Sequence, residues 1–246
     1  MTTPAPVTVA PLEVFLLGEI PLDDVLRLQR RLIYDQGERA GGALILCEHP
    51  PIITVGRSGS RAHITLDDQE LREARLAVRW INRGGGCILH LPGQIAGYLV
   101  LSLDSLGLDL GRYLDLLADI LTDTLAEFDL KARTWTERSG SFLNHSRVAS
   151  LGIAVTRGVA YHGFTLNVGT YLSPFSLLEE PGLEGWPLRQ TSMEAQRQRA
   201  VSMPKVRESL MRHVELRLGL ERHHVYTDHP LIRPKARAHA HILSLG

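Results

Sequence analysis

The stretch from Arg83 to Gln94 holds the densest group of side chains that could take part in chemistry. Arg83 precedes the glycine run 84–86, and Cys87 and His90 follow that run. Backbone without side chains can approach a ligand closely, and consecutive amide N–H groups can bind an anion. The pattern therefore predicts a ligand-binding loop, with a plain turn or bulge as the alternative.

The chain has two cysteines, Cys47 and Cys87, and neither belongs to a C-x-x-C pair. This excludes a disulfide framework and the usual structural zinc motifs. Cys47 lies in a continuous apolar run, which predicts a shielded thiol. Cys87 borders the glycine run and could act as a nucleophile, but residues 87 and 90 of one strand point to opposite faces. A direct Cys87–His90 pair would need a bulge, and the alternative for Cys87 is a small buried side chain.

Histidines supply the other candidate groups. An imidazole titrates near neutral pH, so His90 and His162 are candidates for a proton acceptor, with a hydrogen-bonded structural role as the alternative. The pairs His223-His224 and His239-x-His241 lie in a polar tail without nearby acidic or thiol ligands. Metal ligands normally come as an organised set, so we expect no metal site there.

The composition narrows the class of protein. A chain of 246 residues with 44% hydrophobic and 22% charged residues is typical of a soluble globular protein. The formal net charge is +0, so no overall field attracts nucleic acid or an anionic membrane. No apolar run approaches the roughly 20 residues that span a bilayer. Residues 1–11 lack the basic and apolar regions of a secretory signal, so we expect a cytoplasmic protein.

Periodicity predicts the elements that position these groups. Strands are predicted over residues 12–17, 43–47, 52–55, 77–81, 95–103, 131–136, 148–156 and 159–168. Helices are predicted over residues 21–38, 66–75, 111–128 and 204–218, the second of them capped by Thr65. Residues 137–146 and 169–200 are predicted to be a polar turn and a long loop. Adjacent strands mixed with helices indicate an α+β protein, with one domain over 12–219, a lead-in over 1–11 and a tail over 220–246.

Four segments, taken together and in this order, resemble one family. They are Leu46-Cys47-Glu48-His49-Pro50-Pro51 through Arg57, Arg83 through Gln94, Arg147-Val148-Ala149-Ser150-Leu151-Gly152-Ile153, and Arg157-Gly158 through Val168, with Ser173-Pro174-Phe175 beyond them. The chain resembles the octanoyltransferases of lipoate biosynthesis, within the wider lipoate/biotin protein ligase fold. The resemblance covers about residues 12–193 and implies a mixed, largely antiparallel sheet with packing helices.

The resemblance implies acyl transfer without a cofactor. An octanoyl group moves from the thioester of acyl carrier protein to a lysine of a lipoyl domain, in 2-oxoacid dehydrogenases or the glycine cleavage H protein. No nucleic acid or membrane takes part. In the family a cysteine carries the acyl group and a nearby lysine favours its thiolate. The residues implied for the acyl pocket are Arg83, Gly84, Gly85, Gly86, Cys87, Ile88, Leu89, His90, Ser150, Leu151, Gly152, Gly163, Phe164 and Thr165.

The chain departs from the family at the two catalytic positions. Arg147 stands where the family has its lysine, and arginine cannot accept a proton near neutral pH. The segment 176–182, where the family has its cysteine, contains none, and Pro181 is the nearest match. Arg147 would then supply a fixed positive charge at the mouth of the pocket.

Three interpretations follow from these departures. The first is a transferase in which the acceptor lysine attacks the donor thioester directly with His90 or His162 as base, or in which Cys87 is the nucleophile. The second is a non-catalytic relative that binds an acyl group or a lipoyl domain. The third is an ATP-dependent lipoate ligase, for which Arg147 is a poor phosphate ligand and no G-x-x-x-x-G-K-[ST] loop exists.

Overall fold

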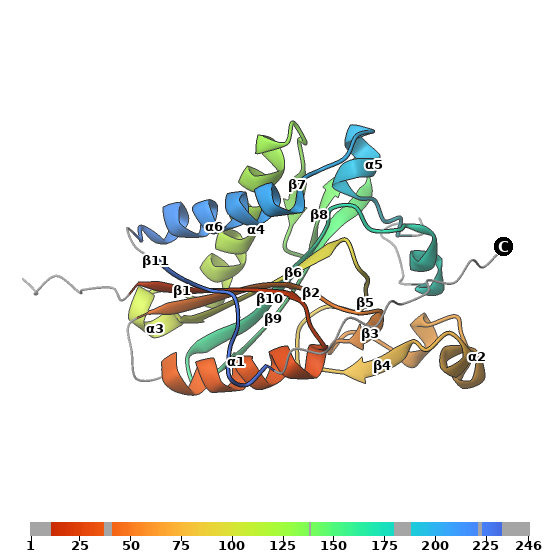
Figure 1. Ribbon diagram of the computed structural model, residues 1–246, viewed down its shortest axis with the longest axis horizontal. Helices are drawn as coiled ribbons and strands as arrows, with labels where there is room; N and C mark the ends of the chain where they lie inside the picture. The colour runs from red at the N-terminus through yellow and green to blue at the C-terminus, as the bar shows by residue number, and fades with distance from the viewer. Residues whose placement is uncertain (1–10, 37–40, 138, 180–187, 221–222, 233–246) are drawn as a thin grey trace, which may run out of the picture.

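A large mixed sheet lies between two helical layers (Figure 1). The computed structural model describes residues 11–36, 41–137, 139–179, 188–220 and 223–232. Within these ranges the strand order of the large sheet is β11-β1-β2-β6-β10-β9-β8-β7. Its strands are β1 (Leu12–Glu19), β2 (Gly42–Glu48), β6 (Gln94–Ser102), β7 (Arg133–Trp135), β8 (Gly140–Leu143), β9 (Ser146–Thr156), β10 (Val159–Asn167) and β11 (His223–Tyr226). In this large sheet, β1 pairs in parallel with β2 and β11, and the other described pairs are antiparallel. The predicted α+β fold with a largely antiparallel sheet is therefore confirmed.

Both faces of this sheet are buried because its central strands are apolar on both sides. In β2, Leu44 and Leu46 pack toward α4 (Leu110–Glu127) and α6 (Met203–Leu218), whereas Ile45 and Cys47 pack toward α1 (Leu22–Gln36). Successive side chains of a strand alternate between faces, so a continuous apolar run is what a doubly covered strand requires. Figure 1 shows α4 and α6 on one side of the sheet and α1 on the other.

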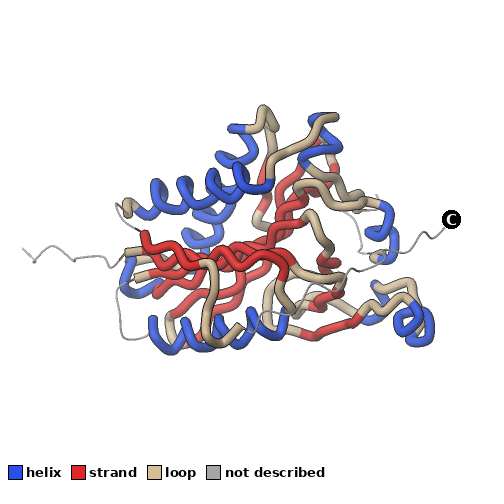
Figure 2. Tube along the Cα trace, viewed as in Figure 1, coloured by secondary structure: helices blue, strands red, loops and turns tan. Residues whose placement is uncertain are grey.

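A smaller sheet, β4-β3-β5, lies beside the large one (Figure 2). Its strands are β3 (Ile52–Val55), β4 (Ala77–Trp80) and β5 (Cys87–His90). Apolar side chains of one face pack against α2 (Asp68–Glu73) and the 3-10 helix η2 (Ser173–Leu177). That face carries Cys87 and Leu89, so alternation turns Thr54, Ile88 and His90 to the opposite face. This opposite face is the one that meets the large sheet at the candidate site.

Most predicted elements are confirmed, and four regions differ. The helix cap is Asp67, whose carboxylate accepts from the backbone N–H of Glu70 while the Glu70 side chain accepts from Asp67 N–H, so the predicted cap at Thr65 was wrong. The predicted turn 137–146 contains β8, whose serine and glycine gave no apolar signal. The predicted loop 169–200 contains η2 and α5 (Met193–Arg197), and β11 adds a strand where no element was predicted. The remaining short elements are η1 (Arg61–His63) and α3 (Leu103–Leu106).

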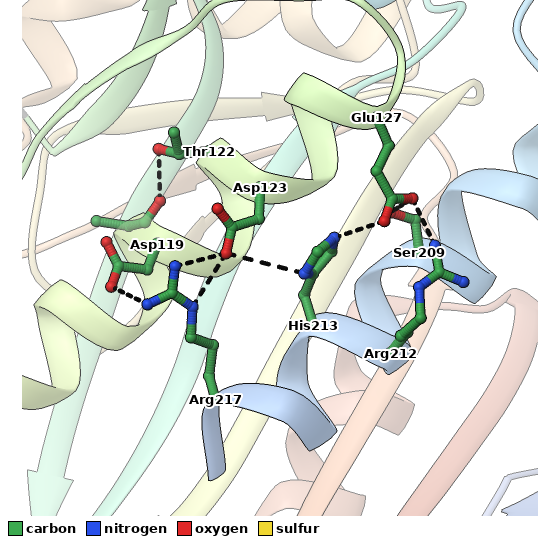
Figure 3. A network of polar contacts seen from close by, with 9 residues as sticks. Asp119, Thr122, Asp123, Glu127, Ser209, Arg212, His213 and Arg217 are labelled. Carbon is green, nitrogen blue, oxygen red and sulfur yellow. Dashed lines mark hydrogen bonds and ion pairs between the residues drawn. The ribbon is translucent and has the colours of Figure 1, made fainter. Parts of the chain in front are cut away.

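An ionic network joins α4 to α6 on the outer surface (Figure 3). Its members are Asp119, Asp123 and Glu127 on α4, and Ser209, Arg212, His213 and Arg217 on α6. Glu127 accepts from Ser209 at 2.7 Å and from Arg212 at 2.5 Å, and it pairs with His213 at 2.8 Å. Burial alone raises the pKa of Glu127, but these hydrogen bonds outweigh it and lower the pKa to about 2.

We expect Glu127→Gln to lower the thermal midpoint by a few degrees at pH 7, because partly exposed ion pairs contribute about 1 kcal/mol or less each. The folded-state pKa of Glu127 lies below its ordinary value of 4.5. Its contribution is therefore present above pH 4.5 and is lost as the pH falls toward 2. Denaturant unfolding of parent and variant between pH 7 and pH 3 checks this, and a difference that persists unchanged at pH 3 would contradict it.

Within the described ranges, no helix combines the length and the hydropathy that crossing a membrane requires. The histidines His223 and His224 lie on the exposed edge strand β11, where His223 contacts Glu215. The pair His239-x-His241 lies outside the described residues.

Candidate active site

A narrow cavity of about 20 Å³ lies where the small sheet meets the large one. Its walls come from the segment 81–83, from β5, and from β6, β9 and β10 of the large sheet. The lining residues are Ile81, Arg83, Ile88, His90, Tyr98, Ser150, Gly152, His162, Gly163, Phe164 and Thr165. A cavity of this size holds about one water molecule. An acyl chain would therefore have to widen it.

Arg83 is the buried charge of this cavity, with 4% of its surface exposed. Its Nη2 donates to the backbone oxygen of Thr54 at 2.9 Å and to Thr54 Oγ1 at 2.7 Å, and its Nη1 donates to Gly84 O at 2.9 Å. A charged group needs such hydrogen bonds to remain charged away from water. The Thr54 hydroxyl in turn lies 3.1 Å from His90 Nε2. Arg83, Thr54 and His90 thus form one connected polar group on the cavity side of the small sheet.

His90 is held as a neutral imidazole. Burial, the neighbouring His49 and the charge of Arg83 lower the pKa of His90 well below its usual value. The Thr54 hydroxyl lies 3.1 Å from Nε2, and a hydrogen bond with the Gln94 side chain partly offsets the lowering of the pKa. Thr54 and Gln94 thus both contribute to the setting of the His90 ring.

A second buried group supports the floor of the cavity. His49 Nδ1 donates to Ile20 O at 2.7 Å, so its Nε2 accepts from the Tyr98 hydroxyl at 2.7 Å. Burial lowers the pKa of His49 to about 4, which agrees with this neutral tautomer. The His49 and His90 rings lie 5.3 Å apart. His49 thus fixes Tyr98, whose ring lines the cavity.

His162 reaches the cavity through an irregular backbone. Phe164 and Leu166 of β10 pack in the core under α4 and α6, so strict alternation would send His162 to that side as well. Instead His162 has φ +64, in the left-handed region that a non-glycine residue seldom adopts. Its ring lies 4.7 Å from that of Tyr161 and 6.4 Å from that of Tyr98, and it lines the cavity.

The protonation state of His162 follows from its surroundings. Burial, then the charges of Arg83 and Arg57, lower the pKa of His162 to about 4, against a hydrogen bond with the Asn82 backbone. Nδ1 has no partner among the described residues, so Nε2 makes the contact with Asn82. A neutral imidazole that donates from Nε2 keeps a lone pair on Nδ1. At neutral pH His162 is therefore a neutral imidazole whose Nδ1 can accept a hydrogen bond.

Neither cysteine faces the cavity. Cys87 is 3% exposed, packs with the core between β5 and α2, and its Sγ lies 3.6 Å from Ser60 O. It therefore lies on the face of β5 opposite to His90, as alternation along the strand requires. Cys47 is fully buried toward α1, and burial raises the pKa of its thiol far above the usual value. Protonated, shielded thiols are poor nucleophiles.

The glycine run packs on the large sheet and does not line the cavity. Gly84 N–H donates to Ile153 O of β9 at 2.8 Å. Gly85 has φ +79, and a Cβ there would lie 3.4 Å from Leu151 O. The run is glycine because two backbones meet here, so a larger residue at Gly85 would disturb the junction between the sheets. Gly86 O accepts from Gly56 N–H at 3.1 Å, which extends the pairing of β3 with β5.

Most of the predicted pocket residues meet at the cavity. Arg83, Ile88, His90, Ser150, Gly152, Gly163, Phe164, Thr165 and His162 all line it. The ring of Phe164 points away, over Gly97 in the core with α4 and α6. Leu89 and Leu151 pack in the two cores that flank the cavity. Gly152 lies close under the glycine run, where a Cβ would be 2.8 Å from Gly84 O.

Arg147 lies on β9 outside the cavity lining. Its N–H donates to Arg189 O at 2.8 Å, and its O accepts from Thr191 N–H at 2.8 Å. Its guanidinium lies 5.7 Å from the centre of the Phe142 ring, an attractive cation–π distance. The segment 189–191 thus fixes the backbone of Arg147. Of the segment 176–182, residues 180–182, including Pro181, lie outside the described residues.

Three functional candidates escaped the sequence prediction. Thr54 and Tyr98 are polar residues within apolar strands, and Gln29 is an uncharged polar residue on the apolar stripe of α1, between Val25 and Leu32. A polar residue that replaces an apolar one in a buried periodic position is the signal that could have found all three. Gln29 is 1% exposed and contacts His162.

Comparisons with known proteins agree with this architecture. The family model of the lipoyl protein ligase A/B catalytic domain matches residues 22–215. An octanoyltransferase of Geotalea uraniireducens is 38% identical over 181 residues, covering 73% of this chain and 80% of the relative. An octanoyltransferase of Geobacter metallireducens is 37% identical over 197 residues, covering 79% and 87%.

Solved structures show the same fold at lower identity. Lipoate-protein ligase A bound with ATP aligns with a TM-score of 0.71 at 17% identity, over 89% of this chain and 90% of that one. A bi-partite lipoate protein ligase from Thermoplasma acidophilum, solved with its E2 lipoyl domain, aligns with a TM-score of 0.67 at 18% identity, over 89% and 88%. The chain therefore belongs to the lipoyl protein ligase A/B catalytic-domain family and, within it, groups with the octanoyltransferases.

Proposed function

We propose that the protein transfers an octanoyl group from a thioester to the side-chain amine of a lysine during protein lipoylation. One observation carries the proposal. Three of the segments that resemble octanoyltransferases, 83–94, 147–153 and 157–168, meet at one buried cavity with two neutral histidines. The donor is acyl carrier protein, and the acceptors are lipoyl domains of 2-oxoacid dehydrogenases or the glycine cleavage H protein. We place the reaction in the cytoplasm.

The transfer proceeds by direct attack of the acceptor lysine. Its neutral Nζ adds to the thioester carbonyl carbon, and the developing oxyanion is stabilised by the nearby positive charge of Arg83. His162 Nδ1 takes a proton from the attacking nitrogen and returns it to the departing sulfur as the carbon–sulfur bond breaks. The products are an amide and a thiol, and no proton or electron is left over. His90 lies on the opposite wall and orients the substrate.

The ligase alternative is not favoured. Curated relatives at 37–38% identity carry the name octanoyltransferase, whereas solved lipoate-protein ligases are similar at 17–18% identity, which concerns the fold. A thioester is already activated for attack by an amine, so this transfer needs no adenylate. Incubation of the protein with octanoyl carrier protein and a lipoyl domain, with and without ATP, tests the proposal. Octanoylated domain should form equally in both; no product would leave acyl binding without transfer as the function.

We expect no octanoyl adduct on the protein, because both thiols are buried away from the cavity. Intact mass after incubation with the octanoyl donor should equal that of the untreated protein while product forms. Cys87→Ser should retain transfer within about two-fold, since Cys87 packs with the α2 core as a small side chain. A stable adduct on the parent that is absent from Cys87→Ser would instead identify Cys87 as the nucleophile.

A larger side chain at position 88 should make the protein favour donors with a shorter acyl chain. Ile88 lines the cavity from β5 and is partly exposed to it, so Ile88→Phe can be made without filling a core position. We expect at least about tenfold lower kcat/KM with an octanoyl donor, and a smaller loss with a butyryl donor. The control is Leu114→Phe, which adds bulk to another partly exposed aliphatic residue, on α4 and outside the cavity lining. Equal losses with both donors would exclude Ile88 from the acyl-binding wall.

A further inference from the structure

The side chain of Gln29, on helix α1, contacts the backbone of His162 in strand β10. Gln29 lies on α1, is 1% exposed, and its Oε1 accepts from the backbone N–H of His162 at 2.9 Å. The residue that Gln29 contacts is the one in β10 with a positive φ.

The contact replaces a missing sheet hydrogen bond. Along β10, Ala160 pairs with Leu101 of β6 and Gly163 pairs with Tyr98, but Tyr161 and His162 have no partner in β6. On the other side, pairing with β9 continues without a break. At the left-handed residue His162, the pairing of β10 with β6 is thus interrupted over two residues. A buried N–H without an acceptor is unfavourable, and Gln29 Oε1 supplies the acceptor.

The irregularity has a consequence for the cavity. With a regular backbone, His162 would project into the core beneath α4 and α6, together with Phe164. With φ +64, its ring joins Tyr98 and Arg83 at the cavity. Strained backbone persists only where surrounding contacts hold it, and it is concentrated at functional sites. The Gln29 amide nitrogen has no partner among the described residues, so acceptance from His162 is the one hydrogen bond this side chain makes there.

We propose that Gln29 is a positioning residue for the transfer, which holds His162 in the left-handed conformation that turns its imidazole toward the substrate. This inference rests on the proposed role of His162 in octanoyl transfer. Gln29 itself touches neither substrate nor the reacting atoms. It acts by selecting one of two orientations of a residue in the same strand.

The experiment compares two variants at Gln29 with one control variant. Gln29→Met has similar length but no acceptor, whereas Gln29→Glu keeps an acceptor oxygen for the His162 N–H. We expect Gln29→Met to lower kcat for octanoyl transfer about tenfold to a hundredfold with little change in KM for the donor, because a misplaced catalytic group costs this much. Gln29→Glu should recover most of that loss. Ser209→Ala, a buried residue in the α4–α6 network, controls for a general loss of stability.

A double-mutant cycle separates positioning from support of the fold. If Gln29 acts through His162, Gln29→Met should have almost no further effect on kcat in a His162→Gln background. Additive losses would overturn the inference and leave Gln29 a structural residue. Hydrogen exchange of the His162 amide gives a readout that does not depend on activity. It should be slow in the parent and faster in Gln29→Met; unchanged exchange would overturn the inference, whereas absence of transfer in the parent would overturn the proposed function alone.

Discussion

His162→Gln should lower kcat for octanoyl transfer by about 10²-fold or more and leave the KM for the donor nearly unchanged, because it removes the proton acceptor and little of the binding surface. Glutamine keeps a polar group of similar size but cannot take up a proton. Rates of amide formation from octanoyl carrier protein, measured on parent and variant, check this. His213→Gln is the matched control, since His213 lies in the α4–α6 network far from the cavity.

The proposed role of His162 as the base also predicts how the transfer rate depends on pH. A base must be unprotonated to act, and the pKa of His162 is lowered to about 4. The rate with the parent should therefore stay level with respect to this group from pH 8 down to about pH 5, and fall below about pH 4. An ordinary histidine would give a fall near pH 6.5. A fall near pH 6.5 that is abolished in His162→Gln would show that the ring is solvated and would contradict the buried geometry.

The buried strands were predictable because their signal is local. The apolar run in β2 carries, within a few residues, the side chains that pack into the cores on both faces of the large sheet. The periodic apolar residues of α4 all pack into the core on one of these faces. The edge elements were not predictable in this way. β11 pairs with β1, so its stability comes from a partner at the far end of the described chain. β8 pairs with its neighbours β7 and β9, but Gly140 and Ser141 take up half of this short strand and give no apolar alternation.

The candidate site was predicted in composition but not in arrangement. The resemblance brought together segments whose residues do line the cavity, such as Ser150 and Gly163. It could not tell which side of each strand faces the ligand. Alternation correctly separated Cys87 from His90, whereas His162 breaks alternation through one dihedral angle that no residue type at that position signals. The glycine run predicts a ligand loop, with a turn or bulge as the alternative, and in the structure Gly84 and Gly85 lie against the backbone of β9.

Arg83 places a buried positive charge beside two imidazoles. Burial first, and the charge of Arg83 after it, lowers the pKa of both His90 and His162, so both rings are neutral at pH 7. The same charge makes each imidazole a weaker base, because a neighbouring cation disfavours protonation. In the proposed transfer, the step that Arg83 can assist is therefore formation of the oxyanion at the thioester carbonyl.

Arg83→Met should consequently abolish transfer and raise the pKa of His162 above its present value of about 4, because the like charge beside the ring is removed. Arg83→Lys keeps the charge but not the planar guanidinium, whose Nη2 donates to both oxygens of Thr54. The pKa of His162 should therefore remain low in Arg83→Lys, and kcat should fall less than in Arg83→Met. Loss of charged hydrogen bonds should also cost about 3 kcal/mol of folding free energy in the methionine variant. Titration of the His162 ring by NMR, together with denaturant unfolding and transfer rates, separates these effects. Burial would still hold the pKa of His162 below its ordinary value in Arg83→Met, so the expected rise is partial. An unchanged His162 pKa would contradict the position of the Arg83 charge beside the ring.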